Sequence, residues 1–125
     1  SKNELTGKLW NAINNYKEFI NMPWFSSWQG YSAVRFNQYK ENKKMALHCD
    51  HIHSMFDGEK KGIPILSVLG VLNDDYEGGE FILFDDYEIK FKKGDVVIFP
   101  SLFLYPHKVE PVTKGTRYSY ISWVW

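Results

Sequence analysis

The stretch IPILSVLGVLNDDYEGGEFILFDDYEIKFKKGDVVIFPS, residues 63–101, decides the fold. Short apolar runs rich in Val, Ile, Leu and Phe alternate in it with turns built on Gly, Asp and Lys. This alternation is the pattern of consecutive β-strands. The predicted strands are residues 63–72, 80–84, 88–91 and 95–99, and the predicted turns are 73–79, 85–86 and 92–94.

The same pattern continues on both sides of this stretch. Further strands are predicted at 31–39, 45–50, 107–111 and 116–125, with the segment 111–115 as a turn. Before them, apolar residues recur every three or four positions, which predicts an amphipathic helix over about residues 4–21. These apolar residues are Leu5, Leu9, Ile13, Tyr16 and Ile20.

One helix followed by about eight short strands predicts a mainly β fold. The expected architecture is a double-stranded β-helix, or jelly roll, with one N-terminal supporting helix. No linker or internal repeat interrupts the sequence. We therefore expect a single domain over residues 1–125, with its β-core at about 31–125.

The composition narrows the classes of function. The chain has 15 Lys and Arg and 15 Asp and Glu, so a uniformly basic nucleic-acid-binding surface is not expected. No apolar run approaches the roughly 18 residues of a membrane span. Cys49 is the one cysteine, which excludes an intrachain disulfide. A polar N-terminus favours a cytoplasmic location, and the Asn- and Lys-rich, Arg-poor composition is typical of an AT-rich source such as a phage.

Three of the four histidines fall within the six residues HCDHIH, 48–53. Because alternate residues of a strand point to the same face, His48 and Asp50 are expected to lie side by side. His107 is the one histidine outside the cluster and begins another predicted strand. Two histidines and one carboxylate form the facial triad of non-haem Fe(II) oxygenases, which leaves three coordination positions open.

Other interpretations of the histidines remain open at this point. His48 and Asp50 with a further histidine would also suit a zinc site. His51 and His53 are interpreted as solvated residues, and residues 53–62 as a polar loop. A His-x-Asp sequence by itself is also compatible with an ordinary surface loop.

The last predicted strand carries an arginine on its inward face. Arg117 and Ser119 share this face with apolar residues, and no acidic residue lies among them. An inward arginine among apolar neighbours is costly unless it meets an anion. A bound carboxylate would satisfy Arg117, with Ser119 as a second donor; a structural salt bridge is the alternative. Because residues 111–115 are predicted as a turn, the strands of His107 and Arg117 are expected to be neighbours.

Taken in order, these motifs resemble the 2-oxoglutarate/Fe(II)-dependent oxygenases, closest to their prolyl-4-hydroxylase-like branch. The matching pattern is His-x-Asp at 48–50, the distal His107, and Arg-x-Ser at 117–119, ten residues further on. The segments VLNDDYEGGEF (71–81) and KGDVVIFPS (93–101) also resemble the family, and the resemblance covers about residues 31–125. The sequence departs from prolyl hydroxylases at Met45 and Val71, where many have Tyr. It departs from nucleic-acid demethylases of the AlkB type at Trp123, where those have Arg.

The resemblance implies cofactors and a role for each of these residues. It implies that Fe(II) is held at the catalytic centre by His48, Asp50 and His107. It implies that 2-oxoglutarate is bound by Arg117, Ser119, Tyr39 and Asn37. With O2 as the other co-substrate, the enzyme would hydroxylate a C–H bond, for example of a prolyl or other residue in a peptide or protein, and release succinate and CO2.

The substrate is the least specified part of this expectation. The candidate rim of the site, residues 24–30, 53–62 and 73–78, is short, which favours a peptide or protein loop over a small molecule. Nucleic acid and membrane partners are not expected, and the sequence indicates no oligomeric state. Two alternatives share the fold: a cupin-like metal-binding module, which does not need Arg117, and a catalytically inactive or structural β-barrel.

Overall fold

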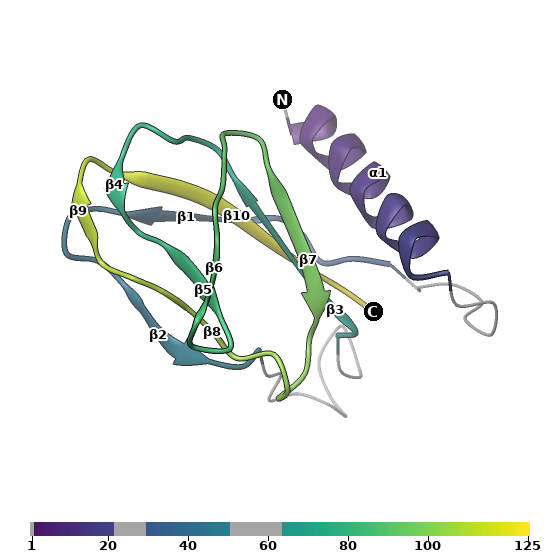
Figure 1. Cartoon of the computed structure of the whole chain (residues 1–125). Helices are drawn as coiled ribbons and strands as arrows, with labels where there is room; N and C mark the ends of the chain where they lie inside the picture. The colour runs from purple at the N-terminus through teal and green to yellow at the C-terminus, as the bar shows by residue number, and fades with distance from the viewer. Residues whose placement is uncertain (1, 22–29, 51–63) are drawn as a thin grey trace.

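Figure 1 shows the computed structural model of the chain, which describes residues 2–21, 30–50 and 64–125. One helix, α1 (Lys2–Ile20), is followed in these residues by ten strands. The strands form two four-stranded antiparallel sheets and one two-stranded ribbon. The predicted mainly β fold with one supporting helix, a double-stranded β-helix, is confirmed.

The first sheet has the strand order β1-β10-β3-β7. Its members are β1 (Arg35–Tyr39), β10 (Arg117–Val124), β3 (Leu66–Val71) and β7 (Val96–Pro100). The second sheet has the order β2-β8-β5-β6. Its members are β2 (Met45–His48), β8 (His107–Val109), β5 (Phe81–Leu83) and β6 (Tyr87–Ile89).

The two-stranded ribbon was not expected from the sequence. It pairs β4 (Glu77–Gly78) with β9 (Val112–Lys114), at the left of Figure 1. Both strands lie in segments that the sequence predicted as turns. The segment 111–115 therefore carries the chain from the second sheet to the first, rather than joining two neighbouring strands. The prediction that the strands of His107 and Arg117 are neighbours is wrong, because β8 and β10 belong to different sheets.

One apolar cluster joins the helix to the first sheet. Leu9 and Ile13 of α1 are fully buried against this sheet. All six residues of β3 are buried because the helix covers one face of the sheet and the second sheet covers the other. Gly70 is required in β3, because a Cβ there would collide with the ring of Tyr120 on the neighbouring strand.

A second cluster fills the space between the sheets. Its buried residues are Leu69, Val71, Phe81, Leu83, Phe99 and Val109, which come from both sheets. Complete burial of each such side chain stabilises the fold by about 1.5–3 kcal/mol. This packed interior fixes the separation of the sheets, and therefore the positions of the polar residues described below.

The helix ends one residue earlier than the sequence pattern predicts. Asn21 follows it with a left-handed backbone (φ 43°), and its N–H donates to the carbonyl of Lys17. Asn tolerates this conformation better than most residues, so it can terminate a helix.

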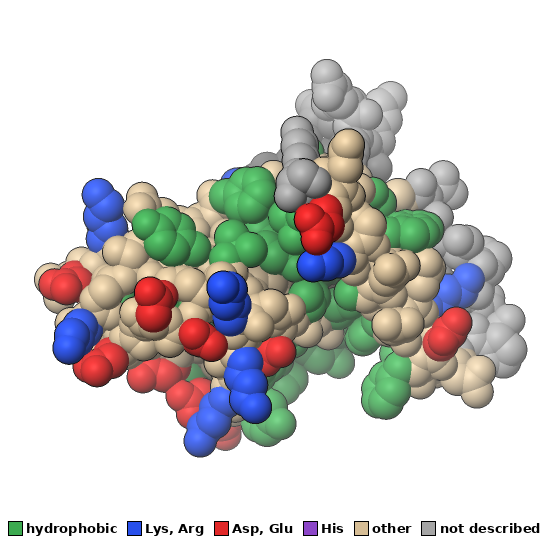
Figure 2. Space-filling model, turned by 90° about the horizontal axis from the view of Figure 1, so that it is seen from above, with side chains coloured by type: hydrophobic (Ala, Val, Ile, Leu, Met, Phe, Trp, Pro, Cys, Tyr) green, Lys and Arg blue, Asp and Glu red, His purple; other side chains and the backbone are tan. Residues whose placement is uncertain are grey.

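Figure 2 shows basic and acidic side chains interspersed over the face seen from above. The described residues of that face form no continuous basic surface, in agreement with the zero net charge of the chain. Among the described residues, no helix combines the length and apolar character needed to cross a membrane.

Candidate metal centre

His48 and His107 are brought together by the pairing of β2 with β8. They are directly opposite in this antiparallel register, where side chains of paired residues are neighbours. Their ring centroids are 4.3 Å apart. Asp50 follows His48 by two residues, just beyond the end of β2, and its carboxylate turns to the same side.

The carboxylate of Asp50 lies within reach of both imidazoles. Its Oδ1 is 3.2 Å from Nε2 of His107 and 3.5 Å from Nε2 of His48. One donor atom from each of the three residues lies within 4.8 Å of the others. Two imidazole nitrogens and one carboxylate oxygen at this spacing form a donor set that suits a single divalent transition metal ion.

Each histidine is also held by a hydrogen bond on the far side of its ring. Nδ1–H of His48 donates to the carbonyl of Ala46 at 2.9 Å, and Nδ1–H of His107 donates to that of Tyr105 at 3.1 Å. A carbonyl can only accept, so the proton of each neutral ring sits on Nδ1. Each Nε2 therefore directs a lone pair toward the other donors, as metal-binding histidines do.

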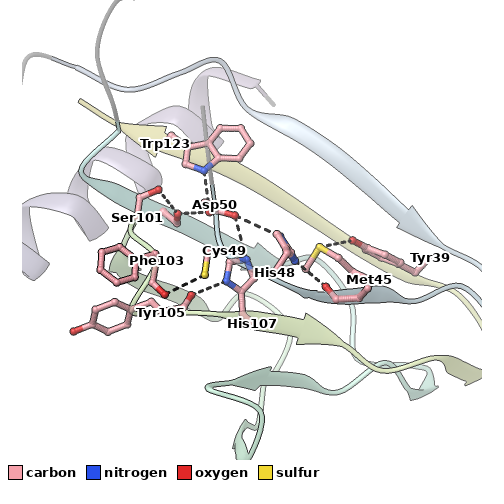
Figure 3. A network of polar contacts seen from close by, with 12 residues as sticks. Tyr39, Met45, His48, Cys49, Asp50, Ser101, Phe103, Tyr105, His107 and Trp123 are labelled. Atoms are coloured by element: carbon pink, nitrogen blue, oxygen red, sulfur yellow. Dashed lines mark hydrogen bonds and ion pairs between the residues drawn. The ribbon is translucent and has the colours of Figure 1, made fainter. Parts of the chain in front are cut away.

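The second oxygen of Asp50 is tied to the opposite sheet (Figure 3). Oδ2 accepts a hydrogen bond from the indole Nε1–H of Trp123 at 3.0 Å and another from the hydroxyl of Ser67. The Ser67 hydroxyl in turn lies 3.0 Å from that of Ser101. Strand alternation predicts Trp123 on the same face as Arg117 and Ser119, but these contacts could not be predicted, because no local pattern links positions 50, 67 and 123.

These contacts set the charge state of the carboxylate. Burial alone would raise the pKa of Asp50, but hydrogen bonds from the protonated forms of His107 and His48, and from Ser67 and Trp123, outweigh it and hold that pKa well below its usual range. The hydrogen bond to Asp50 also raises the pKa of His48, against the opposing effect of burial. The carboxylate is thus an anion at neutral pH, ready to accept a cation.

These donors line a pocket of about 320 Å³. This volume is at the lower end of the range for small-molecule sites, about 300–1,000 Å³. Its walls combine the metal-type donors and other polar side chains with the apolar side chains of Met45, Leu69 and Ile121. The lining residues are Arg35, Asn37, Tyr39, Met45, His48, Cys49, Asp50, Leu69, His107, Ile121 and Trp123.

Arg117 lies beside this pocket and is completely buried. Its Nη1 donates to Oγ of Ser119 at 3.1 Å, while Nε and Nη2 have no hydrogen-bond partner within the described part of the chain. No acidic side chain satisfies the guanidinium there. An unpaired buried cation is strongly unfavourable, so this arrangement points to an anion that the protein binds.

Asn37 and Tyr39 are next to this arginine. In the register of β1 with β10, Asn37 is opposite Ser119 and Tyr39 is opposite Arg117. Asn37 and Tyr39 also line the pocket. The four residues that the resemblance assigned to 2-oxoglutarate thus lie next to one another, and two of them, Asn37 and Tyr39, line the same pocket as His48, Asp50 and His107.

The structure describes only part of the predicted rim of the site. Residues 73–78 do not line this pocket. The side chain of Asn73 is used to hold the start of β10: its amide donates to the carbonyl of Thr116, and its Oδ1 accepts from the N–H of Tyr118. The other rim segments, 24–30 and 53–62, fall outside the described residues except Gly30, as do His51 and His53.

Comparison with known sequences identifies the family. The sequence profile of the 2OG-Fe(II) oxygenase superfamily matches residues 34–125. A PKHD-type hydroxylase of Xylella fastidiosa (strain M12) is 37% identical over 107 residues, which cover 72% of this chain and 43% of the relative. One of Acinetobacter baumannii (strain SDF) is 37% identical over 95 residues, covering 71% and 41%.

Solved structures agree on the fold. The 2OG complex of a viral collagen prolyl hydroxylase from Paramecium Bursaria Chlorella virus-1 superposes with a TM-score of 0.73 at 20% identity, covering 98% of this chain and 71% of that one. A Pseudomonas putida prolyl-4-hydroxylase gives 0.65 at 22% identity, covering 90% and 60%.

The chain spans less than half the length of the curated relatives it matches. The region matched by the profile nevertheless includes His48, Asp50, His107, Arg117 and the strands that carry them. On this match, and with the predicted resemblance confirmed, the chain belongs to the 2OG-Fe(II) oxygenase superfamily.

Proposed function

We propose that this chain carries the catalytic site of a 2-oxoglutarate- and Fe(II)-dependent dioxygenase, which hydroxylates a C–H bond and releases succinate and CO2. One observation carries the proposal: a buried arginine, two of whose nitrogens have no hydrogen-bond partner among the described residues, lies beside a pocket lined by a His-Asp-His donor set. A metal-binding module without oxidation has no use for such an arginine. The cupin-like alternative explains one end of the site and leaves the other unexplained.

The donor set fits Fe(II). His48, Asp50 and His107 would bind the ion on one side and leave the other side open. Both histidines offer Nε2, and Asp50 offers Oδ1 with its charge retained at neutral pH. When bound together, the iron and 2-oxoglutarate supply the oxidising chemistry.

The other end of the site fits a dicarboxylate. Arg117 would pair with the far carboxylate of 2-oxoglutarate through Nε and Nη2, and the Ser119 hydroxyl would add a second donor. Tyr39 and Asn37 would shield this ion pair from water, since both line the pocket and lie opposite Arg117 and Ser119 in the register of β1 with β10. Apolar walls at Met45, Leu69 and Ile121 would exclude water from the reacting centre.

We further propose a peptide or protein substrate, with a prolyl residue as the first candidate. The site is open on one side, where the His48 side chain remains 37% exposed, so an extended segment has access to it. A similar fold, at 21% identity, was solved as a prolyl hydroxylase from Trichoplax adhaerens in complex with a peptide fragment. This likeness supports peptide candidates as the first to be screened.

The cofactor pair is tested before any substrate. Fe(II) and then 2-oxoglutarate are added to the purified protein without oxygen, and the visible spectrum is recorded. A charge-transfer band from chelated 2-oxoglutarate is expected. It should vanish in Asp50→Ala, weaken in Arg117→Ala, and persist in Asp85→Ala, a matched control in which the lost carboxylate is exposed and pairs with Lys108.

The absence of any band, together with tight zinc binding, would reject the oxygenase proposal and favour the cupin-like alternative. If the band forms, oxygen-dependent succinate release is measured next. Proline-containing peptides are compared with peptides that carry alanine at the same position. Succinate release that does not depend on the peptide would reject the prolyl substrate while leaving the cofactor pair intact.

A further inference from the structure

We propose that Trp123 and Ser67 are positioning residues that restrict Asp50 to binding the metal through one oxygen. The inference rests on the proposed function, because it assumes a metal held by His48, Asp50 and His107. It adds a role for two residues from the sheet opposite Asp50, neither of which touches the metal-type donor atoms of the histidines.

The two oxygens of Asp50 have different surroundings. Oδ1 faces the two Nε2 atoms, at 3.2 and 3.5 Å. Oδ2 faces away from them and accepts from the Trp123 indole at 3.0 Å and from the Ser67 hydroxyl. The Asp50 side chain is 6% exposed, so neither donor can readily be replaced by bulk water. The hydrogen bonds to Oδ2 therefore orient the carboxylate so that Oδ1 is directed toward the two histidines.

The donors of these hydrogen bonds are themselves fixed in place. Ser67 and Ser101 are buried and their hydroxyl oxygens are 3.0 Å apart. Ser67 has one hydroxyl proton, and it goes to the carboxylate of Asp50, which can only accept. The Trp123 ring is covered by the guanidinium of Arg35, 5.5 Å from its centroid, a stacking that favours one orientation of the indole.

This arrangement has a consequence for the metal. A carboxylate with two free oxygens can bind a cation through both of them, and Asp50 would then fill two coordination positions. Two hydrogen bonds on Oδ2 make that mode costly, because a partly buried indole N–H and a buried hydroxyl would lose their acceptor. Coordination through Oδ1 alone leaves three positions, which are needed for the two chelating atoms of 2-oxoglutarate and for O2.

A purely structural role is the competing explanation. In that case the two donors only satisfy a buried carboxylate, and their loss would lower stability without changing how the metal is bound. The two roles predict different effects on the affinity and coordination of the metal. They are distinguished by measuring affinity, coordination and stability on the same variants.

The experiment uses Co(II), whose visible bands report its coordination number, with no 2-oxoglutarate and no turnover. Trp123→Phe removes the indole donor and keeps an aromatic ring; Ser67→Ala removes the hydroxyl, and Ser67→Thr keeps it. Trp10→Phe on α1 and Ser122→Ala in β10 are matched controls outside the site. Co(II) affinity, the Co(II) spectrum and the thermal unfolding of the metal-free protein are measured for each.

Trp123→Phe and Ser67→Ala are each expected to lose about 10–100-fold in Co(II) affinity, the usual effect of removing a group that orients a ligand. Their Co(II) bands should weaken and shift toward those of a higher coordination number. Ser67→Thr and both controls should keep the wild-type affinity and spectrum. The double variant should lose more than either single variant.

Two results would overturn the inference in distinguishable ways. If wild-type protein binds no Co(II), the proposed function fails and the inference fails with it. If wild-type protein binds Co(II) but Trp123→Phe and Ser67→Ala keep its affinity and spectrum, only the inference fails. The second result includes the case in which these variants unfold at lower temperature, which would assign Trp123 and Ser67 a structural role.

Discussion

Tyr39 and Arg117 face each other across neighbouring strands, with the guanidinium carbon of Arg117 5.3 Å from the centroid of the Tyr39 ring. They are paired residues in the register of β1 with β10. The face of an aromatic ring attracts a cation, and Ser119 accepts the one hydrogen bond found for this guanidinium among the described residues. Tyr39 and Ser119 together hold Arg117 in one orientation.

The ring of Tyr39, rather than its hydroxyl, is therefore expected to support 2-oxoglutarate binding. Tyr39→Phe loses only a weak contact to Sδ of Met45 at 3.8 Å and should change the Kd for 2-oxoglutarate little. Tyr39→Leu should raise this Kd by about 2–30-fold, equivalent to about 0.5–2 kcal/mol. Calorimetric titration without oxygen, with Mn(II) in place of iron, measures both; equal losses in the two variants would contradict the role of the ring.

Replacing Arg117 by Met should separate stability from binding. The metal-free variant is expected to be as stable as wild type or more stable, because it no longer buries a charge that meets no acidic side chain among the described residues. In the presence of metal, 2-oxoglutarate at 100 times its Kd should stabilise wild type by about 2.7 kcal/mol and the variant not at all. Thermal unfolding with and without 2-oxoglutarate tests this, and a variant that keeps the full stabilisation would show that the dicarboxylate binds elsewhere.

Lowering the pH should change two properties in opposite directions: the contribution of His48 to the stability of the metal-free protein, and the metal affinity. The pKa of His48 is raised in the fold by its hydrogen bond to Asp50. Its contribution to stability is thus complete below the unfolded value of about 6.5 and is lost as the pH rises through the folded value. Metal binding needs the neutral ring, so the affinity should instead rise with pH.

His48→Gln isolates this effect. From pH 8 to pH 6 the unfolding temperature of metal-free wild type should increase relative to that of the variant, while the Co(II) affinity of wild type falls. The pKa of Asp50 is lowered, so its own contribution is present above about pH 4 and is lost only in more acidic solution. A wild-type advantage that grows toward pH 8 would contradict the assignment.

Much of the site could be predicted because strand periodicity and residue chemistry act locally. Alternation along one strand put Arg117, Ser119 and Trp123 on one face, and the structure has them there. Alternation also put His48 and Asp50 on one side, although β2 ends at His48. The type of each side chain then limited the chemistry: an inward arginine without an acidic neighbour needs an anion.

The rest depended on which strands pair, and pairing is not local. The sequence contains nothing that assigns His107 and Arg117 to different sheets, because the segment 111–115 has the residues of a turn and forms β9 instead. The contacts of Asp50 with Trp123 and Ser67 join positions 73 and 17 residues apart. The paired glycines at 78 and 79 could be predicted as a turn, but the nearness of Gly79 to Arg117 could not.

Gly79 provides the last prediction, because it makes room for this arginine. Its φ is +64°, and a Cβ at this position would lie 3.1 Å from Cδ of Arg117 and 3.1 Å from Cγ2 of Val112. Gly94 is a matched control, since its φ is +91° and a Cβ there would meet nothing within 4 Å.

Both Gly→Ala variants should lose about 1–2 kcal/mol of stability from the left-handed backbone. Gly79→Ala should lose more because of crowding, and it alone should weaken 2-oxoglutarate binding. Chemical denaturation and calorimetry on both variants give the comparison, and equal effects of the two on binding would mean that the position of Arg117 does not depend on Gly79.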